Sequence, residues 1–290
     1  MEMGSTMVDG LSATLRALSF IALFQAAGIA TFVVLFGRMI PVTEAGTRRV
    51  GVLSALLAIA FLVTQYLLEA ARMSGELAGA MDPTLQTLVL HSPTSTALAV
   101  RVAGLVLIAL GLHGVGIAPR SMSIVGILLV VSAFALVGHT TSHPNRVFLS
   151  ALLLPHLLIV AFWFGALLPL YRASVGESAV LAGTVTEAFS RLAVWIVPAL
   201  LIAGVLLAAF LLPSIAALRT TYGELLLAKL AAFSLLMLLG ALNKWRLGPA
   251  LTRGEPRAIP LFRRTLAFEY ALIAGTLSVT AVLTSFYSPD

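Results

Sequence analysis

The chain has 290 residues, of which 60% are hydrophobic and 10% are charged, and its formal charge is +6. A soluble domain carries about 25% charged and about 45–50% apolar residues, so this composition excludes a soluble globular protein. No polar stretch exceeds about 25 residues, which is too short for a soluble domain on a membrane anchor. The excess of 18 Lys and Arg over 12 Asp and Glu therefore indicates basic loops beside a membrane. Cysteine is absent, which excludes disulfides, thiolate metal sites and cysteine nucleophiles.

Long apolar runs without alternation predict membrane-spanning helices rather than barrel strands. The expected fold is all-α, a polytopic membrane protein with eight transmembrane helices. Pro119 and Arg120 join the third and fourth spans so closely that these should form an antiparallel hairpin. The first ten residues lack a basic region, so we expect no cleaved signal peptide. The eight spans are Leu11–Phe36, Val50–Glu69, Thr96–Ala118, Ser121–Val137, Leu149–Leu170, Ala193–Leu212, Gly223–Leu247 and Leu266–Phe286.

The distribution of Lys and Arg predicts the orientation. Twelve of them lie in the loops after the first, third, fifth and seventh spans, and five lie on the opposite side. The positive-inside rule therefore places those loops in the cytoplasm and both termini outside, which is the periplasm for a bacterial inner membrane.

Spans three and seven resemble each other, because each carries a basic residue about two turns in, Arg101 and Lys229 respectively. This similarity indicates a possible four-plus-four repeat with parallel halves, although Leu-rich helices also resemble one another by chance. We expect one integral membrane domain over residues 1–290, with the first four spans in 1–137 and the last four in 138–290.

Polar groups inside membrane spans are costly, so each is a candidate functional residue. His156 and Lys229 each lie six or seven residues into a span, about 10 Å below the outer surface, and are expected to share one cavity. The other polar residues toward the outer side are Gln65, Glu69, Arg101 and His139. Those toward the cytoplasm are His113, Arg191, Asn243, Lys244, Arg246 and Glu269.

Three of the five histidines, His139, His143 and His156, fall within 18 residues between spans four and five. Neutral imidazole is a common ligand for copper, zinc and iron. Pro144 favours an extended conformation at His143. We therefore expect His139 and His143 to lie in a loop and not to form a rigid pair on one helix. Pro155 leaves a backbone carbonyl without its helical donor beside His156. The alternative is that these histidines are interfacial polar or helix-packing residues.

The basic side chains of Lys229 and Arg101 complicate a metal site, since a positive charge beside a bound metal cation is unfavourable. We expect Glu69 or water to neutralise Lys229 or Arg101. Glu269 is expected to pair with Lys244 or Arg246 in a structural role. The external methionines suit Cu(I) but are more simply apolar filler.

The motifs resemble the copper resistance D (CopD) family of bacterial inner-membrane proteins. Gly138 and His139 are followed by His156 with Leu157 and Leu158, and then by Trp163 in an aromatic segment. The segments 189–193, 222–230 and 241–247 are similar to the family in order and spacing, and Arg101 and Glu269 have expected counterparts. Two positions depart from the pattern, namely Pro155, where an aliphatic residue is usual, and Ala166, where a second Gly is usual.

This resemblance implies a copper transporter that takes Cu(I) or Cu(II) from the periplasm toward the cytoplasm, often alongside a separate CopC-like carrier. The implied metal residues are His139, His143 and His156, with possible support from Glu69, Gln65, Arg101, Lys229, Trp163 and His113. A haem b-type redox protein with two His ligands is the alternative, with His139 and His156 as the pair. An assembly or sensor protein without transport is a third interpretation. No enzyme motif and no aromatic-interleaved basic patch for nucleic acid is found.

Overall fold

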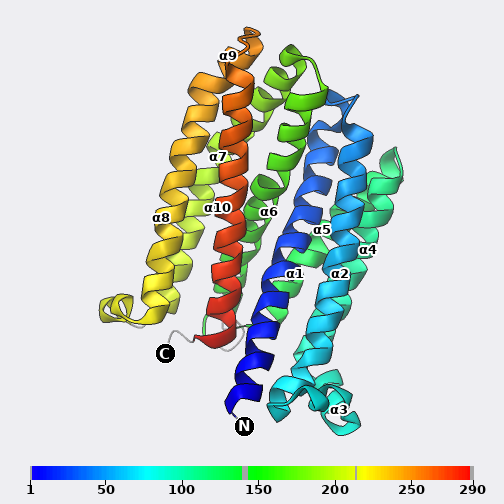
Figure 1. The fold of residues 1–290 in the computed structure, drawn as a ribbon, viewed down its shortest axis with the longest axis vertical. Coiled ribbons are helices and arrows are strands. Elements are labelled where there is room, and N and C mark those ends of the chain that lie inside the picture. The colour runs from blue at the N-terminus through cyan, green and yellow to red at the C-terminus, as the bar shows by residue number, and fades with distance from the viewer. Residues whose placement is uncertain (1, 139–142, 213, 288–290) are drawn as a thin grey trace.

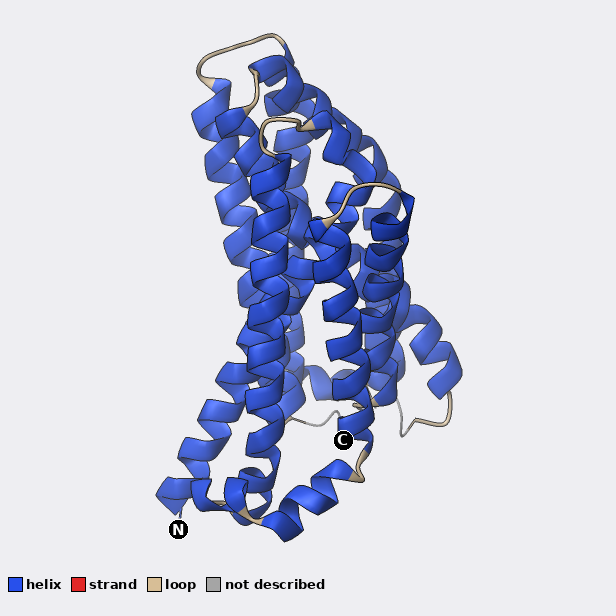
Figure 2. Cartoon of the chain, turned by 90° about the vertical axis from the view of Figure 1, so that its right-hand side faces the viewer, coloured by secondary structure: helices blue, strands red, loops and turns tan. Residues whose placement is uncertain are grey.

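The computed structural model describes residues 2–138, 143–212 and 214–287. Within those ranges the chain is helical without strands, and eight helices are long and apolar enough to cross a membrane (Figures 1 and 2). The all-α fold with eight spans that the sequence predicts is confirmed.

The first half contains four long helices and one short one. Helix α3 begins at an Asp82 cap, whose carboxylate accepts from the Thr84 and Leu85 backbone N–H groups. The elements are α1 (Glu2–Phe36), η1 (Gly37–Met39), α2 (Glu44–Ser74), η2 (Leu77–Met81), α3 (Pro83–Leu90), α4 (Pro93–His113), α5 (Ile117–Ser132) and η3 (Ala133–Leu136).

The second half repeats this order of four long helices. Helix α8 runs without a break into a π-helical turn, η5, which rotates the phase of the residues that follow. The elements are α6 (Arg146–Gly176), α7 (Ala179–Leu211), η4 (Ile215–Arg219), α8 (Thr221–Leu242), η5 (Asn243–Leu247), α9 (Gly248–Thr252) and α10 (Ala258–Phe286).

Several helices extend beyond the apolar runs that mark them in the sequence. Helix α7 begins at Ala179, well before the predicted Ala193. Its first part carries Glu187 and Arg191, which lowers the hydropathy, but it buries Ala182 and Val185 on one face. The apolar run therefore marks the membrane-crossing part and not the whole helix.

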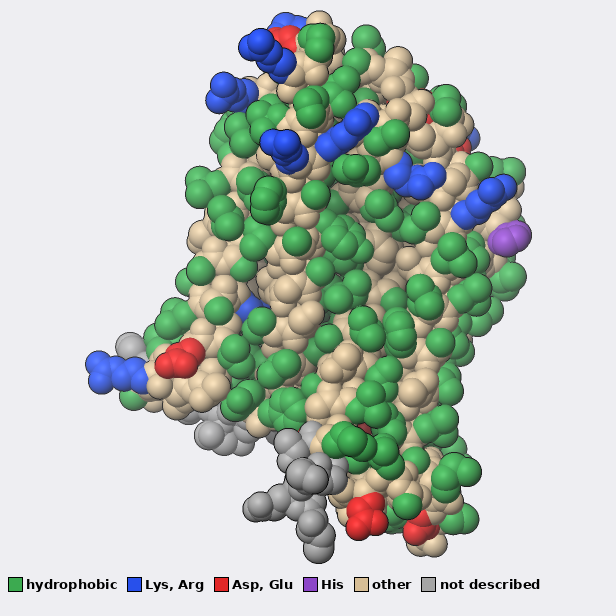
Figure 3. Space-filling model, viewed as in Figure 1, with side chains coloured by type: hydrophobic (Ala, Val, Ile, Leu, Met, Phe, Trp, Pro, Cys, Tyr) green, Lys and Arg blue, Asp and Glu red, His purple; other side chains and the backbone are tan. Residues whose placement is uncertain are grey.

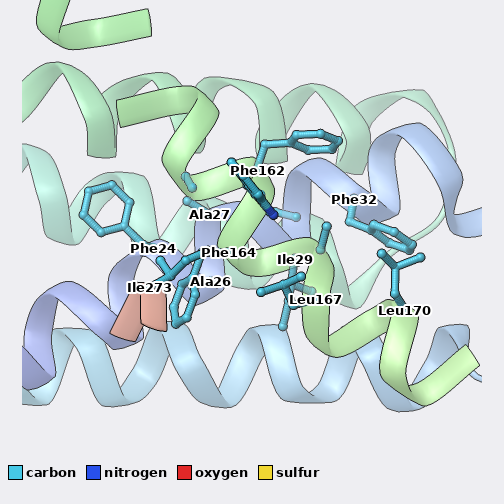
Figure 4. Close-up of a cluster of buried hydrophobic side chains, with 14 of the residues drawn as sticks. Phe24, Ala26, Ala27, Ile29, Phe32, Phe162, Phe164, Leu167, Leu170 and Ile273 are labelled. Atoms are coloured by element: carbon cyan, nitrogen blue, oxygen red, sulfur yellow. The ribbon is translucent and has the colours of Figure 1, made fainter. Parts of the chain in front are cut away.

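Helix α1 is the centre of the bundle and packs in parallel against α6. About 72% of its apolar stretch is buried inside the protein, against 6% for the α8 span. Figure 4 shows Phe24 and Phe32 of α1 beside Phe164 and Leu170 of α6. The two backbones meet at glycines.

Gly28 and Gly165 allow this close approach. A Cβ atom on Gly28 would lie 1.9 Å from the Ala161 carbonyl oxygen, and one on Gly165 would lie 2.3 Å from the Gly28 Cα. Small residues at the crossing of membrane helices let the backbones come together, which maximises dispersion contacts.

The packing supports the predicted repeat. Helix α1 packs against α2 and α5, and α6 packs in the same way against α7 and α10. Arg101 follows the first residue of α4 by eight positions, and Lys229 follows the first residue of α8 by the same number. The halves differ in how their third long helices pack: α4 packs against α1 and closely against α2, whereas α8 has no comparable packing against α6 or α7. Figure 1 shows α8 at the edge of the bundle.

Basic side chains mark one end of the bundle. Most Lys and Arg side chains on the face in Figure 3 gather at its upper end, and the two termini lie at the lower end in Figure 1. One basic side chain is recessed at mid-height among hydrophobic ones.

Candidate functional site

His156 faces α7 and α8 from the N-terminal third of α6. A Cβ atom on Gly204 of α7 would lie 3.3 Å from its Cε1, so the ring packs directly on that helix. Lys229 of α8 lies close enough for its charge to act on this ring. Its Nδ1 atom is buried and has no hydrogen-bond partner among the described residues. The expectation from equal depth, that His156 and Lys229 lie together, agrees with this arrangement.

Glu269 is the centre of a buried hydrogen-bond network. Its side chain is 2% exposed. One carboxylate oxygen accepts from Trp163 Nε1 at 3.2 Å, and the other accepts from Asn243 Nδ2 at 2.5 Å. The Thr265 hydroxyl in turn donates to Asn243 Oδ1 at 2.5 Å. The network joins α6, η5 and α10.

The expected pairing of Glu269 with Lys244 or Arg246 is wrong. The ion pairs found between described residues do not include Glu269, whose partners are the two neutral donors. The π-helical turn explains this, because it buries Asn243 and leaves Arg246 exposed. An acidic residue three turns into a span is thus held by uncharged groups.

His156 and the Glu269 network lie along one path through the bundle. Trp163 follows His156 by seven residues, which places it on the same face of α6 about 10 Å deeper. Its ring meets Phe233 edge-on, with centroids 6.5 Å apart, and lies 3.9 Å from the position of a Cβ on Gly240. Met237 is on that same face of α8 and is 38% exposed. We call the following six residues the polar column: His156, Lys229, Trp163, Glu269, Asn243 and Thr265.

The other candidate histidines lie elsewhere. His143 Nδ1 accepts from the Asn145 backbone N–H at 3.0 Å, in the turn before α6. His156 lies ten residues into α6, about 15 Å along the axis from its start, so the two fit successive positions better than one shared ion. His113 is exposed at the end of α4. His139 lies outside the described residues. The part of the chain that is described contains no group of three His, Asp or Glu placed to hold a metal ion.

Glu69, Gln65 and Arg101 belong to the first half and line a separate cavity between α2 and α4. Glu69 pairs with Arg16 at 3.6 Å and with Arg72 at 3.4 Å. The expectation that Glu69 neutralises Lys229 or Arg101 is therefore wrong as to the partner. Glu69 and Arg101 line the same cavity, but Arg16 of α1 is the cation that pairs with Glu69, and Lys229 lies on α8 in the other half.

One buried polar residue is not among the candidates named from the sequence. Gln25 of α1 is 4% exposed, and neither atom of its amide has a hydrogen-bond partner within the described residues. Its position as a single glutamine in a long apolar span is the signal by which it could have been found.

Comparison with known families gives two matches. The model described as "Copper resistance protein D" matches residues 183–283, and "Copper resistance protein D-like, N-terminal domain" matches residues 7–147. No curated protein and no solved structure matches. Helix α6 falls largely between the two matches, so the placement of His156 and Trp163 rests on the geometry of this chain. The two matches flank α6 and together take in seven of the eight spans. The chain belongs to the copper resistance protein D family.

Proposed function

We propose that the protein carries copper across the bacterial inner membrane, from the periplasm toward the cytoplasm, along the polar column. The observation that carries this proposal is the line of polar groups from His156 to Asn243 inside a multi-pass membrane protein of a copper resistance family. Polar residues facing the interior of a helix bundle are the usual mark of an ion path.

Copper enters at the outer end. His139 and His143 receive it at the mouth, and a separate periplasmic carrier of the CopC type is the proposed donor. His156 is the first ligand within the membrane, because its buried Nδ1 has no hydrogen-bond partner among the described residues and a neutral imidazole nitrogen binds copper well. The thioether of Met237 is a soft donor on the facing helix and suits Cu(I).

Lys229 and Glu269 have opposite electrostatic effects on a cation that moves along this path. Lys229 lies close enough to His156 to repel a cation there, which weakens retention at the outer position. Glu269 lies deeper and offers a carboxylate without a cationic partner in the described chain. Repulsion above and attraction below both favour inward movement of a cation.

Copper uptake into cells or vesicles tests the proposal. We expect His156→Ala to reduce uptake at least about tenfold, since changes at or next to a metal ligand cost 10–100-fold in affinity. His139→Ala should also reduce it. His113→Ala is the matched control, because this histidine is exposed and lies outside the polar column. Unchanged uptake in both His156→Ala and His139→Ala, at equal expression, would overturn the assigned site.

The visible spectrum of the purified protein separates transport from the haem alternative. We expect no Soret band in protein from haem-sufficient cells. A Soret band that disappears in His156→Ala would contradict the copper proposal and favour haem ligation by that histidine.

A further inference from the structure

The cavity between the outer parts of α2 and α4 is lined by Arg101, for which no hydrogen-bond acceptor is found among the described residues. Its polar lining comes from Gln65, Tyr66 and Glu69 of α2 and from Thr94 and Arg101 of α4. We call this cavity the Arg101 pocket. It belongs to the first half of the chain and shares no residue with the polar column.

Within the described part of the chain, the interaction found for the Arg101 guanidinium is its contact with an aromatic ring. Its guanidinium carbon lies 4.4 Å from the centre of the Phe134 ring, and Phe134 stacks on Phe24 with centroids 5.6 Å apart. The Nε atom is buried without a hydrogen-bond partner, and no ion pair or hydrogen bond of this side chain is found among the described residues. A guanidinium has five N–H donors and stays charged, so a buried one needs acceptors.

The charges around the pocket leave one positive charge uncompensated. Asp9 pairs with Arg72 at 3.4 Å, and Glu69 is shared between Arg16 and Arg72. Both carboxylates are therefore engaged by other arginines. Arg16 also lies close enough to repel Arg101 electrostatically. Among the described side chains, three arginines thus converge with two carboxylates, which leaves one positive charge there without an anionic partner.

We propose that the Arg101 pocket binds one oxyanion group, a phosphate, with Arg101 as its charge partner. Gln65, Tyr66 and Thr94 supply neutral donors from both walls of the pocket. Arginine matches phosphate oxygens in a bidentate geometry, which a lysine does not reproduce. The phosphate comes either from a lipid headgroup or from solution, and the two sources share this chemistry. Bound there, it links α2 to α4.

Thermal unfolding of the full chain in detergent, after lipid removal, tests the proposal. One arm adds inorganic phosphate against chloride at equal ionic strength, and the other adds phosphatidylglycerol against an uncharged detergent. We expect one arm to raise the Tm of the wild type by several degrees, since a ligand that binds only the folded state stabilises it. Arg101→Gln should lose the shift, with affinity reduced at least about tenfold. Arg219→Gln, an exposed cation near the same end of the bundle, is the matched control and should keep it.

The variants also separate binding from a purely structural role. Without any added phosphate, Arg101→Gln should unfold at the same temperature as the wild type or higher, because it removes a buried charge that lacks a partner. If this variant does not fold, Tyr66→Phe, which lacks one donor, should show a weakened shift. No shift of the wild type in either arm overturns the proposal. Equal Tm shifts in Arg101→Gln and Arg219→Gln would also overturn the proposal, because they would mean that phosphate is attracted to the basic surface in general.

Discussion

Glu269 is an acidic side chain that the protein keeps inside the bundle with neutral donors. Trp163 and Asn243 each give it one hydrogen bond, and Thr265 fixes the Asn243 amide in the orientation that donates. Asn243 stands between two partners, because it donates to Glu269 and accepts from Thr265. Such networks are strongly coupled, because a member left unpaired in a buried place pays the full cost of its desolvation.

Removing one member of this network should destabilise the protein by about 1–3 kcal/mol. We expect Trp163→Phe and Glu269→Gln each to lower the free energy of unfolding in detergent by that amount. In the double variant the losses should be less than additive, with a coupling of about 0.5–3 kcal/mol. Trp245→Phe, at a tryptophan that is 74% exposed, is the control and should change little. Strictly additive losses would contradict the coupling.

Sequence reasoning identified the ionisable residues of the membrane spans but not all of their partners. Depth is readable from position in a span, so His156 and Lys229 were expected at one level and do interact. Lateral neighbours depend on which helices pack together and on helix phase. For that reason position in the sequence does not reveal that Glu69 pairs with Arg16, or that the π-helical turn directs Arg246 away from Glu269.

At the scale of helices, the crossing of α1 and α6 determines how the halves fit together. Eight apolar runs were enough to predict the eight spans, because a membrane requires that length of apolar helix. They were not enough to predict the ends of α7, whose first turns are amphipathic, or the contact at Gly28. A glycine in an apolar run does not show by itself which helix approaches it.

Adding a single methyl group at this crossing should separate the helices. We expect Gly28→Ala to lower the folded yield and Tm markedly, because its Cβ would overlap the α6 backbone, which has no flexible side chain to move aside. Gly275→Ala is the control within another span. Nothing lies within 4 Å of its added Cβ, so that change should be neutral or slightly stabilising. Equal loss in both variants, measured by size-exclusion chromatography and thermal unfolding, would count against the close contact.

At the scale of the whole molecule, the basic end of the bundle predicts its orientation. The chain has no natural cysteine, so a single introduced one reports one position. We expect a membrane-impermeant maleimide to label Met81→Cys in intact spheroplasts, and to label Val115→Cys only after permeabilisation. These residues are 85% and 83% exposed and lie at opposite ends of α4 in the connections before and after it. The reverse pattern would invert the proposed direction of copper entry.

The separation of α8 from α7 gives the two halves different mechanical stiffness. Displacing α1 would break the largest buried core of the protein, whereas α8 is fastened mainly to α10 and keeps little of its surface inside. Any rearrangement that admits a large, soft ion should therefore be taken up by α8, the helix that carries Lys229. The first half, in which α2 packs closely against α4, would stay in place during such a movement of α8.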